Sequence, residues 1–382
     1  MIQIKIDKKN VNFRDLHFDK VHSELEELLK NEKCTTTFEY EILKWIEDNL
    51  EKILLSTTND LRKVIQNFNL FIDRYNDEVY LTLSNISLEK SKKVLRTISL
   101  ENLKKVTDYN ESNNIDNSSK KEIYIKRLMN INSATIPIPN EFRFKVLKER
   151  INFKLSKIFI DFYSKEWDKI KGYDRYTFVS KHNLKTCPYC NMGYILLSKR
   201  DENKKNGLRP EIDHFFPKAT YPYLAMSFYN LIPSCKVCNH TKSSKDTFVD
   251  GLLSPYEINS STFKLTYTPK NMNFLQIKKR KYNFNSFDIK FKKIDEHSNS
   301  YFKLDKLYEQ HKDVVLELLI KRTIYSKSYI EELKRNFHFT DDEIYRFLFC
   351  NYKESDEFDK RPLSKLIKDI TDELGFVRVG IR

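Results

Sequence analysis

Residues 187–190 read CPYC, and residues 235–238 read CKVC. Each Cys-x-x-Cys pair can wrap a tight turn that aims two sulfurs at one ion, and two such pairs can close a tetrahedral four-thiolate site. Four thiolates leave no open coordination position, so we predict one structural Zn²⁺ that takes no part in a reaction. The predicted ligands are Cys187, Cys190, Cys235 and Cys238.

The same cysteines allow two other interpretations. They could be four buried small residues at a chance spacing, but two close pairs among only six cysteines disfavour this. CPYC alone is compatible with a redox motif, but the surrounding residues lack the βαβ pattern that such a motif needs. In a reducing compartment, paired cysteines favour a metal over a disulfide.

A zinc ion held by both pairs would force the segment between them to fold as a small unit. Residues 192–200 (MGYILLSKR) predict a strand, and residues 208–218 (LRPEIDHFFPK) predict the returning strand, which ends at Pro217. After a loop, the second half of residues 230–245 (NLIPSCKVCNHTKSSK) predicts a short helix that begins at Asn239. We therefore expect a strand-strand-helix unit around the metal.

Asp213 and His214 lie side by side between Ile212 and the aromatic residues Phe215 and Phe216. A buried strand avoids adjacent polar residues unless both are satisfied. The two residues are therefore either a structural hydrogen-bonded pair or part of an active site. The surrounding motif distinguishes these two interpretations.

That motif resembles the signature of HNH nucleases, also called the ββα-metal fold, over about 60 of the 382 residues. Its marks are Asp213-His214, Asn230-Leu231 and Cys235-Lys-Val-Cys238-Asn239-His-Thr-Lys242, bracketed by the two cysteine pairs. The resemblance implies that His214 is the general base and that Asp213 and Asn239 bind a catalytic Mg²⁺ or Mn²⁺. It implies that Asn230 ties the loop and orients the strand that carries His214.

The chemistry of phosphodiester hydrolysis fits these residue types. The reaction needs an activated water, a cation on the scissile phosphate and a stabilised leaving oxygen. Mg²⁺ prefers oxygen ligands, such as those of Asp213 and Asn239, and a neutral imidazole can take a proton from water near physiological pH. His214 would point away from Asp213 in a continuing strand, so we expect the strand to end there.

His240 follows Asn239 directly and offers an alternative ligand. If His240 bound the ion, Asn239 would act as a helix cap. The Asn-x-x-Lys register of residues 239–242 favours Asn239 as the ligand.

The chain carries 68 Lys and Arg against 54 Asp and Glu, a net charge of +14. Such an excess favours a polyanionic partner. However, the preference for Lys over Arg and the scarcity of Gly are also typical of proteins from AT-rich genomes, so the charge alone does not decide the partner.

Four lysines near the motif are predicted to contact phosphates. Phosphate contacts carry no sequence information, so we expect DNA binding of low sequence specificity, and the sequence does not distinguish DNA from RNA. The basic, aromatic-rich residues 276–293 could extend this surface, but a single amphipathic strand with lysines on its solvated face explains them better. The four lysines are Lys218, Lys236, Lys242 and Lys245.

The predicted fold class is mainly α, with a small central α+β unit of the ββα-metal HNH type and some additional β-strands. We expect a helical domain over 1–180 with a scaffold or partner role and a zinc-stapled nuclease domain over 181–250. Strands and then C-terminal helices are expected over 251–382. In the N-terminal helices, Val21, Leu25 and Leu28 recur at helical spacing.

The layout resembles bacterial HNH effectors of phage defence, including the Septu type that works with a partner ATPase. The chain itself has no Gly-rich phosphate loop, so ATP use by this chain is not expected. It shows no signal peptide or membrane-length apolar run, which predicts a cytoplasmic protein with no membrane association. The alternatives are an HNH restriction or homing nuclease, a non-catalytic zinc nucleic-acid-binding module, and a regulatory subunit of a larger complex.

Overall fold

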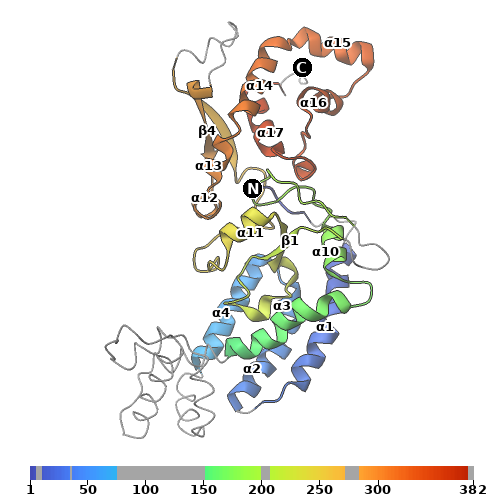
Figure 1. The fold of residues 1–382 in the computed structure, drawn as a ribbon, viewed down its shortest axis with the longest axis vertical. Helices are drawn as coiled ribbons and strands as arrows, with labels where there is room; N and C mark the ends of the chain where they lie inside the picture. Colours follow the sequence, from blue (N-terminus) through green and yellow to red (C-terminus); the bar gives the residue numbers. More distant parts are fainter. Residues whose placement is uncertain (6–10, 35–36, 75–150, 199–206, 272–283, 377–382) are drawn as a thin grey trace, which may run out of the picture. The chain divides into compact units, whose positions relative to one another are not determined.

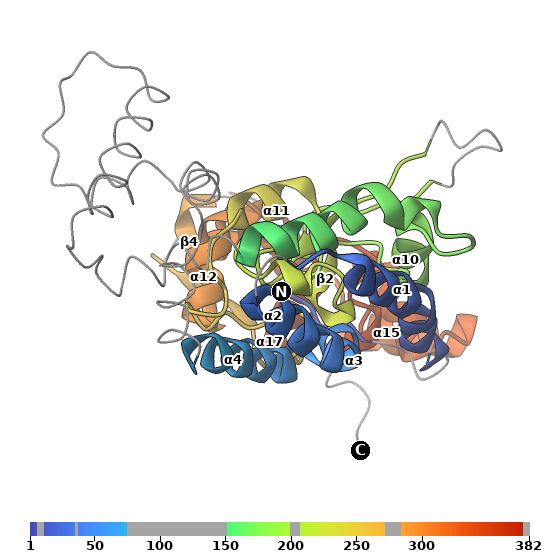
Figure 2. The same ribbon diagram turned by 90° about the horizontal axis from the view of Figure 1, so that it is seen from below.

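The described part of the chain is mainly helical and carries two two-stranded antiparallel sheets (Figures 1 and 2). None of the helices in this part is long and apolar enough to cross a membrane. The computed structural model describes residues 1–5, 11–34, 37–74, 151–198, 207–271 and 284–376.

The chain divides into two compact units, each built from separate stretches of sequence. The cysteine unit comprises Met1–His17, Asp168–Pro217 and Tyr229–Arg382. The helical unit comprises Phe18–Trp167 and Lys218–Phe228. The domain boundaries predicted near residues 180 and 250 stay predictions.

The helical unit contains most of α1, which begins in the cysteine unit, and the helices that follow it. In Figures 1 and 2 these helices, in blue, lie beside the green helical segment that starts at residue 151. Lys154 of that segment forms ion pairs with Glu39 at 3.2 Å and Glu32 at 3.6 Å. The elements are α1 (Val11–Asn31), α2 (Thr37–Asp48), α3 (Leu50–Leu55), α4 (Thr58–Arg74), the π-helical turns η2 (Ser156–Ile160) and η3 (Phe162–Glu166), and the 3₁₀ turns η4 (Trp167–Lys169) and η5 (Pro222–Leu224).

The helical spacing of Val21, Leu25 and Leu28 is confirmed, since all three residues lie in α1. Val21 and Leu25 are fully buried, but Leu28 is 40% exposed, and Leu29 is buried in its place. In an α-helix, the residues three and four positions after Leu25 both lie within about 90° of it around the helix axis. The spacing alone therefore allows either Leu28 or Leu29 to be the buried residue. Tertiary packing selects Leu29.

The cysteine unit contains both sheets and the C-terminal helices. Its helices begin at defined caps: Asp174 accepts a hydrogen bond from Thr177 N at the start of α10, and Thr340 and Glu343 form a capping box at the start of α16. The elements are α10 (Arg175–His182), β1 (Glu211–His214), η6 (Phe228–Asn230), β2 (Leu231–Ser234), α11 (Lys236–Lys242), β3 (Lys264–Pro269), η8 (Phe284–Ser286), β4 (Phe287–Lys293), α12 (Glu296–Phe302), α13 (Leu304–Glu309), α14 (Lys312–Ile324), α15 (Lys327–Phe337), α16 (Asp341–Phe349), η9 (Ser355–Glu357) and α17 (Ser364–Glu373).

The predicted pairing of residues 192–200 with residues 208–218 is found only in part among the described residues, because β1 has another partner. Strand β1 pairs antiparallel with β2, with Asp213 opposite Ile232 and His214 opposite Leu231. The expected first strand forms only isolated bridges, such as that between Ser198 and Leu208. The closing of the two cysteine turns on each other brings the segment just before Cys235 beside β1, a long-range effect that local patterning does not contain.

Helix α11 begins at Lys236 and not at Asn239 as predicted. Cys235 is its N-cap, and the Cys235 sulfur accepts a hydrogen bond from Cys238 N at 3.4 Å. The sulfur therefore caps the helix in the way that a Ser or Asp oxygen usually does.

The second sheet confirms the alternation predicted for residues 287–293. In β4, Phe287 and Ile289 are buried, whereas Lys290 is exposed. Helix α13 packs on β4 and α17 packs on β3 (Figure 1). The basic residues 276–283, which precede this sheet strand, lie outside the described residues.

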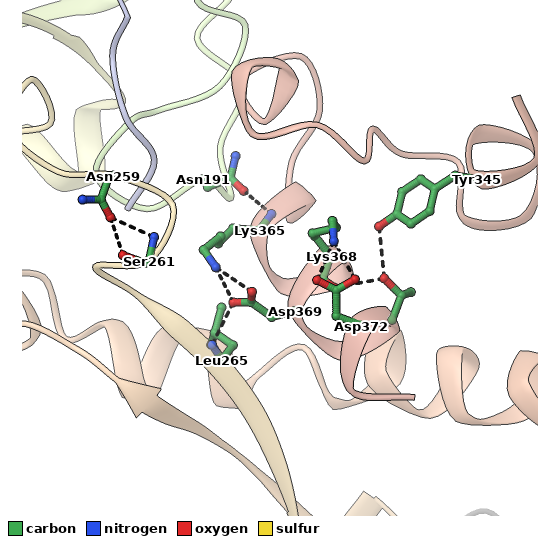
Figure 3. A network of polar contacts seen from close by, with 10 residues as sticks. Asn191, Asn259, Ser261, Leu265, Tyr345, Lys365, Lys368, Asp369 and Asp372 are labelled. Atoms are coloured by element: carbon green, nitrogen blue, oxygen red, sulfur yellow. Dashed lines mark hydrogen bonds and ion pairs between the residues drawn. The ribbon is translucent and has the colours of Figure 1, made fainter. Parts of the chain in front are cut away.

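A buried ion pair on α17 anchors β3. Lys365 Nζ lies 2.6 Å from both oxygens of Asp369, and Asp369 Oδ2 accepts a hydrogen bond from Leu265 N at 2.8 Å (Figure 3). Burial lowers the pKa of Lys365 and raises the pKa of Asp369, so solvent exclusion opposes both charges. Their mutual contact and the strand amide offset that cost.

Asn191 joins the CPYC turn to the C-terminal segment. Its side chain is fully buried, with φ at 53° in the left-handed region. Asn191 Nδ2 donates to Thr186 Oγ1 at 3.1 Å and to Phe358 O at 2.9 Å, and Asn191 Oδ1 accepts from Lys365 N at 3.0 Å (Figure 3). One amide side chain therefore satisfies groups from three separate parts of the cysteine unit.

We expect Asn191→Ala to destabilise the protein far more than Asn183→Ala. Both asparagines have left-handed φ, so each substitution costs about 1 kcal/mol of backbone strain. Asn183 is exposed, whereas Asn191→Ala also leaves buried backbone groups of Phe358 and Lys365 unpaired, for a total of about 3 kcal/mol. Urea unfolding of the two variants measures the difference. Equal losses would show that the Asn191 hydrogen bonds contribute nothing.

Candidate metal centre and active site

The two cysteine pairs come together as predicted. One ligand sulfur from each of the four cysteines lies within 4.8 Å of the other three. With Zn–S bonds of about 2.3 Å, a tetrahedral site needs sulfurs about 3.8 Å apart, so this cluster has the dimensions to hold a metal such as zinc. Cys187, Cys190 and Cys238 are buried, and Cys235 is half-buried.

Short backbone turns aim the sulfurs inward. In the CPYC turn, Asn191 N donates to Cys187 O at 2.7 Å, and Met192 N donates to the Cys190 sulfur at 3.4 Å. The Cys238 amide makes the equivalent contact to the Cys235 sulfur in the second turn. These amide donors favour the thiolate form, which is the form that binds metal.

The thiols of the cluster compete for protons. Burial raises the pKa of Cys187. Hydrogen bonds from neighbouring thiols, with Cys187 the largest contribution, lower the pKa of Cys190. A bound divalent cation would favour the thiolate form of all four sulfurs, because metal ligands have to be deprotonated.

The CPYC turn contacts the candidate active site through Tyr189. The Tyr189 hydroxyl donates to Asp213 Oδ2 at 2.6 Å, and its ring stacks on Phe302 with the ring centroids 4.6 Å apart. Burial raises the pKa of Tyr189, so the phenol keeps the proton that it donates. The Tyr189 side chain therefore links the CPYC turn directly to Asp213.

Strand β1 and helix α11 lie side by side (Figure 1). Polar side chains join them. Glu211 and Asp213 lie two residues apart and share one face of β1. Asn239 and Lys242 lie three residues apart and share one face of α11. Asn239 Nδ2 donates to Glu211 Oε2 at 2.6 Å, and Lys242 Nζ lies 3.1 Å from Asp213 Oδ1.

The Asp213–Lys242 contact is buried. The side chain of Asp213 is 4% exposed and that of Lys242 is 0% exposed. Lys242 Nζ also donates to His214 O at 2.7 Å, so the ammonium contacts the last two residues of β1. Loss of one partner of such a pair would leave a charge buried and uncompensated.

His214 is the last residue of β1 and is 7% exposed. The chain bends after His214, and Phe215 N donates to Asn230 O at 2.8 Å. The Asn230 side chain contacts both groups of Phe216: Oδ1 accepts from Phe216 N at 2.6 Å, and Nδ2 donates to Phe216 O at 3.2 Å. Asn230 thus holds the backbone two residues beyond His214.

The four lysines predicted to contact phosphate lie in different environments. Lys236 and Lys245 are exposed, and Lys245 Nζ lies 5.0 Å from the centre of the Tyr301 ring. Lys218 belongs to the helical unit, with its Nζ 4.7 Å from the centre of the Tyr163 ring. The ammonium of Lys242 is buried against Asp213, so we do not include Lys242 in a nucleic-acid surface.

Sequence reasoning missed Glu211 and Tyr189. The signal for Glu211 was its place two residues before Asp213, which puts both carboxylates on one face of a strand. Tyr189 stands between two predicted zinc ligands, and nothing in that spacing indicated a contact with Asp213. His240, the alternative ligand, is 66% exposed, with its Nε2 3.8 Å from Glu211 Oε1.

No protein-family model matches the chain, and no solved structure matches it. Among curated proteins, the Septu protein PtuB of Bacillus thuringiensis is similar to this chain, with 33% identity over 102 residues. The similarity covers 27% of this chain and 35% of PtuB, so the chain spans about a third of the length of this relative. The chain is therefore similar to part of a Septu protein, the type that the layout of the sequence led us to expect.

Proposed function

We propose that this protein is a metal-dependent HNH endonuclease that hydrolyses phosphodiester bonds of DNA with low sequence specificity. We further propose that it acts in Septu-type anti-phage defence together with an ATPase partner. The observation that supports the nuclease most strongly is the strand-strand-helix order of β1, β2 and α11 beside a four-cysteine cluster. The partial similarity to PtuB supports the defence role.

In this proposal the zinc is structural. Four cysteine ligands would fill its coordination sphere, so the ion would hold the two turns together and leave the reaction to other groups. The bond between Tyr189 and Asp213 would then transmit the position of the CPYC turn to the active site.

Asp213 and Asn239 would hold the catalytic Mg²⁺ or Mn²⁺. Among the described residues, each Asp213 oxygen accepts one hydrogen bond, which leaves each oxygen a further lone pair. In the same part of the structure nothing donates to Asn239 Oδ1. When bound, the ion would polarise the scissile phosphate and stabilise the leaving oxygen.

His214 would act as the general base. Imidazole is the side chain that exchanges protons near physiological pH, and His214 is the last residue of β1, where it pairs with Leu231. Lys242 holds the carbonyl of His214 and Asn230 holds the backbone of Phe216, which would keep the imidazole in a constant position toward an attacking water.

A zinc nucleic-acid-binding module without catalysis is the second candidate. The exposed lysines Lys236 and Lys245 favour it as much as they favour a nuclease. Such a module would have no use for Asp213, His214 and Asn239 in one small unit, so a cleavage assay separates the two functions.

We expect the purified protein to contain one zinc ion per chain, and Cys238→Ser to lose it. At free zinc 1,000-fold above the dissociation constant, bound zinc stabilises the fold by about 4 kcal/mol, so the variant should unfold at a clearly lower temperature. Elemental analysis and thermal unfolding measure both effects. The matched control is Cys34→Ser, an exposed cysteine outside the cluster, which should keep both zinc and stability.

His214→Ala should reduce Mg²⁺- or Mn²⁺-dependent cleavage of plasmid DNA by about 10²- to 10⁴-fold, because removal of a general base costs that much. Zinc content and unfolding temperature should stay at the wild-type values. The exposed His297 on α12 provides a control, since His297→Ala should cleave normally. Cleavage by His214→Ala at the wild-type rate would exclude His214 as the base.

A further inference from the structure

Glu211 lies at the solvent-facing end of the β1–α11 contact. Its side chain is 34% exposed, whereas the side chains of Asp213 and Lys242 are almost completely buried. A cation that arrives from solvent therefore meets the Glu211–Asn239 contact before the Asp213–Lys242 contact. Glu211 carries no role in the motif that predicted the other site residues.

An asparagine side chain has two chemically different ends. Its Oδ1 can bind a cation, but its Nδ2 has two protons and no free lone pair for a metal. The torsion that exchanges the two ends is broad and roughly two-fold, so an isolated Asn presents either end with similar ease. A ligand role for Asn239 therefore requires a partner that selects the orientation.

Glu211 is such a partner. An ionised carboxylate only accepts hydrogen bonds, so the group that lies 2.6 Å from Glu211 Oε2 has to be the Nδ2 end of Asn239. This contact turns Asn239 Oδ1 away from Glu211. Nothing in the described residues donates to that oxygen, so it stays available.

We infer that Glu211 is a positioning residue that orients Asn239 so that its carbonyl oxygen binds a divalent cation. This inference rests on the proposed metal-dependent nuclease site. Glu211 acts through a charge-assisted hydrogen bond to Asn239 and does not itself bind the ion. Partners that orient metal ligands in this way change metal affinity by about 10- to 100-fold when they are removed.

An orienting role of Glu211 can be distinguished from a purely electrostatic role. A negative charge near the site would attract any cation and would be lost equally in Glu211→Ala and Glu211→Gln. An orienting role depends on a hydrogen-bond acceptor, which glutamine keeps in its Oε1 and alanine does not. The two variants therefore separate orientation from charge.

The test uses the full-length, zinc-loaded protein and Mn²⁺ as the probe, with binding followed by electron paramagnetic resonance. Glu211→Ala should raise the Mn²⁺ dissociation constant about tenfold, and Glu211→Gln should stay within about threefold of the wild type. Asn239→Ala should weaken binding at least as much as Glu211→Ala. The double variant should bind Mn²⁺ no more weakly than Asn239→Ala alone, since the two residues act as one unit.

The control variant is Thr241→Ala, which changes an exposed side chain of α11 whose hydroxyl donates to Val237 O, and it should leave Mn²⁺ affinity unchanged. Zinc content and unfolding temperature check that each variant is folded. Cleavage of plasmid DNA, measured in parallel, should follow Mn²⁺ occupancy across the series.

Several results would overturn the inference while the nuclease proposal stands: normal Mn²⁺ affinity in Glu211→Ala, equal losses in the Ala and Gln variants, or a further loss in the double variant. Conversely, the predicted pattern of Mn²⁺ affinities in a protein that cleaves no DNA would support the inference and count against the nuclease. A wild-type protein that binds no Mn²⁺ would overturn both.

Discussion

The convergence of four sulfurs within 4.8 Å is the constraint on which the cysteine unit depends. Two turns that are far apart in the sequence meet there, and each turn then makes contacts of its own. Cys190 O accepts a hydrogen bond from the Tyr308 hydroxyl of α13, and Asn191 holds the backbone of the segment that leads into α17. The cluster is thus the junction of the central strands and the C-terminal helices.

From this junction, one hydrogen bond leads to the candidate active site. Tyr189 stands between two of the cysteines, so the position of its hydroxyl follows from the geometry of the CPYC turn. Asp213 receives that hydroxyl on one oxygen and Lys242 on the other. A structural metal that takes no part in the reaction would in this way control the orientation of a carboxylate that the proposed reaction needs.

Buried polar pairs have a common role in this unit. Lys242 with Asp213 and Lys365 with Asp369 each place a lysine and a carboxylate where water is excluded. Such pairs contribute little net stability, because desolvation offsets the attraction between the charges. Each pair also binds a backbone group of a strand, His214 O in β1 and Leu265 N in β3. Each pair therefore fixes the position of a helix along the strand beside it.

The sequence alone determined the features that depend on residue type and short spacing. Cys-x-x-Cys pairs predict their own turns, and the period of two in residues 287–293 predicts which side chains are buried. The order of Asp213, His214, Asn230 and Asn239 in the sequence predicts the candidate site. The chemistry of these side chains is local, so it can be read without the fold.

Tertiary structure decided the features that depend on long-range contacts. These features are the pairing of β1 with β2, the buried contact of Lys242 with Asp213, and the hydrogen bond between Asn239 and Glu211. A sequence states which groups can form a hydrogen bond or an ion pair, but many partners are chemically equivalent. The choice among them depends on the free energy of packing the whole unit, which no single stretch of residues contains.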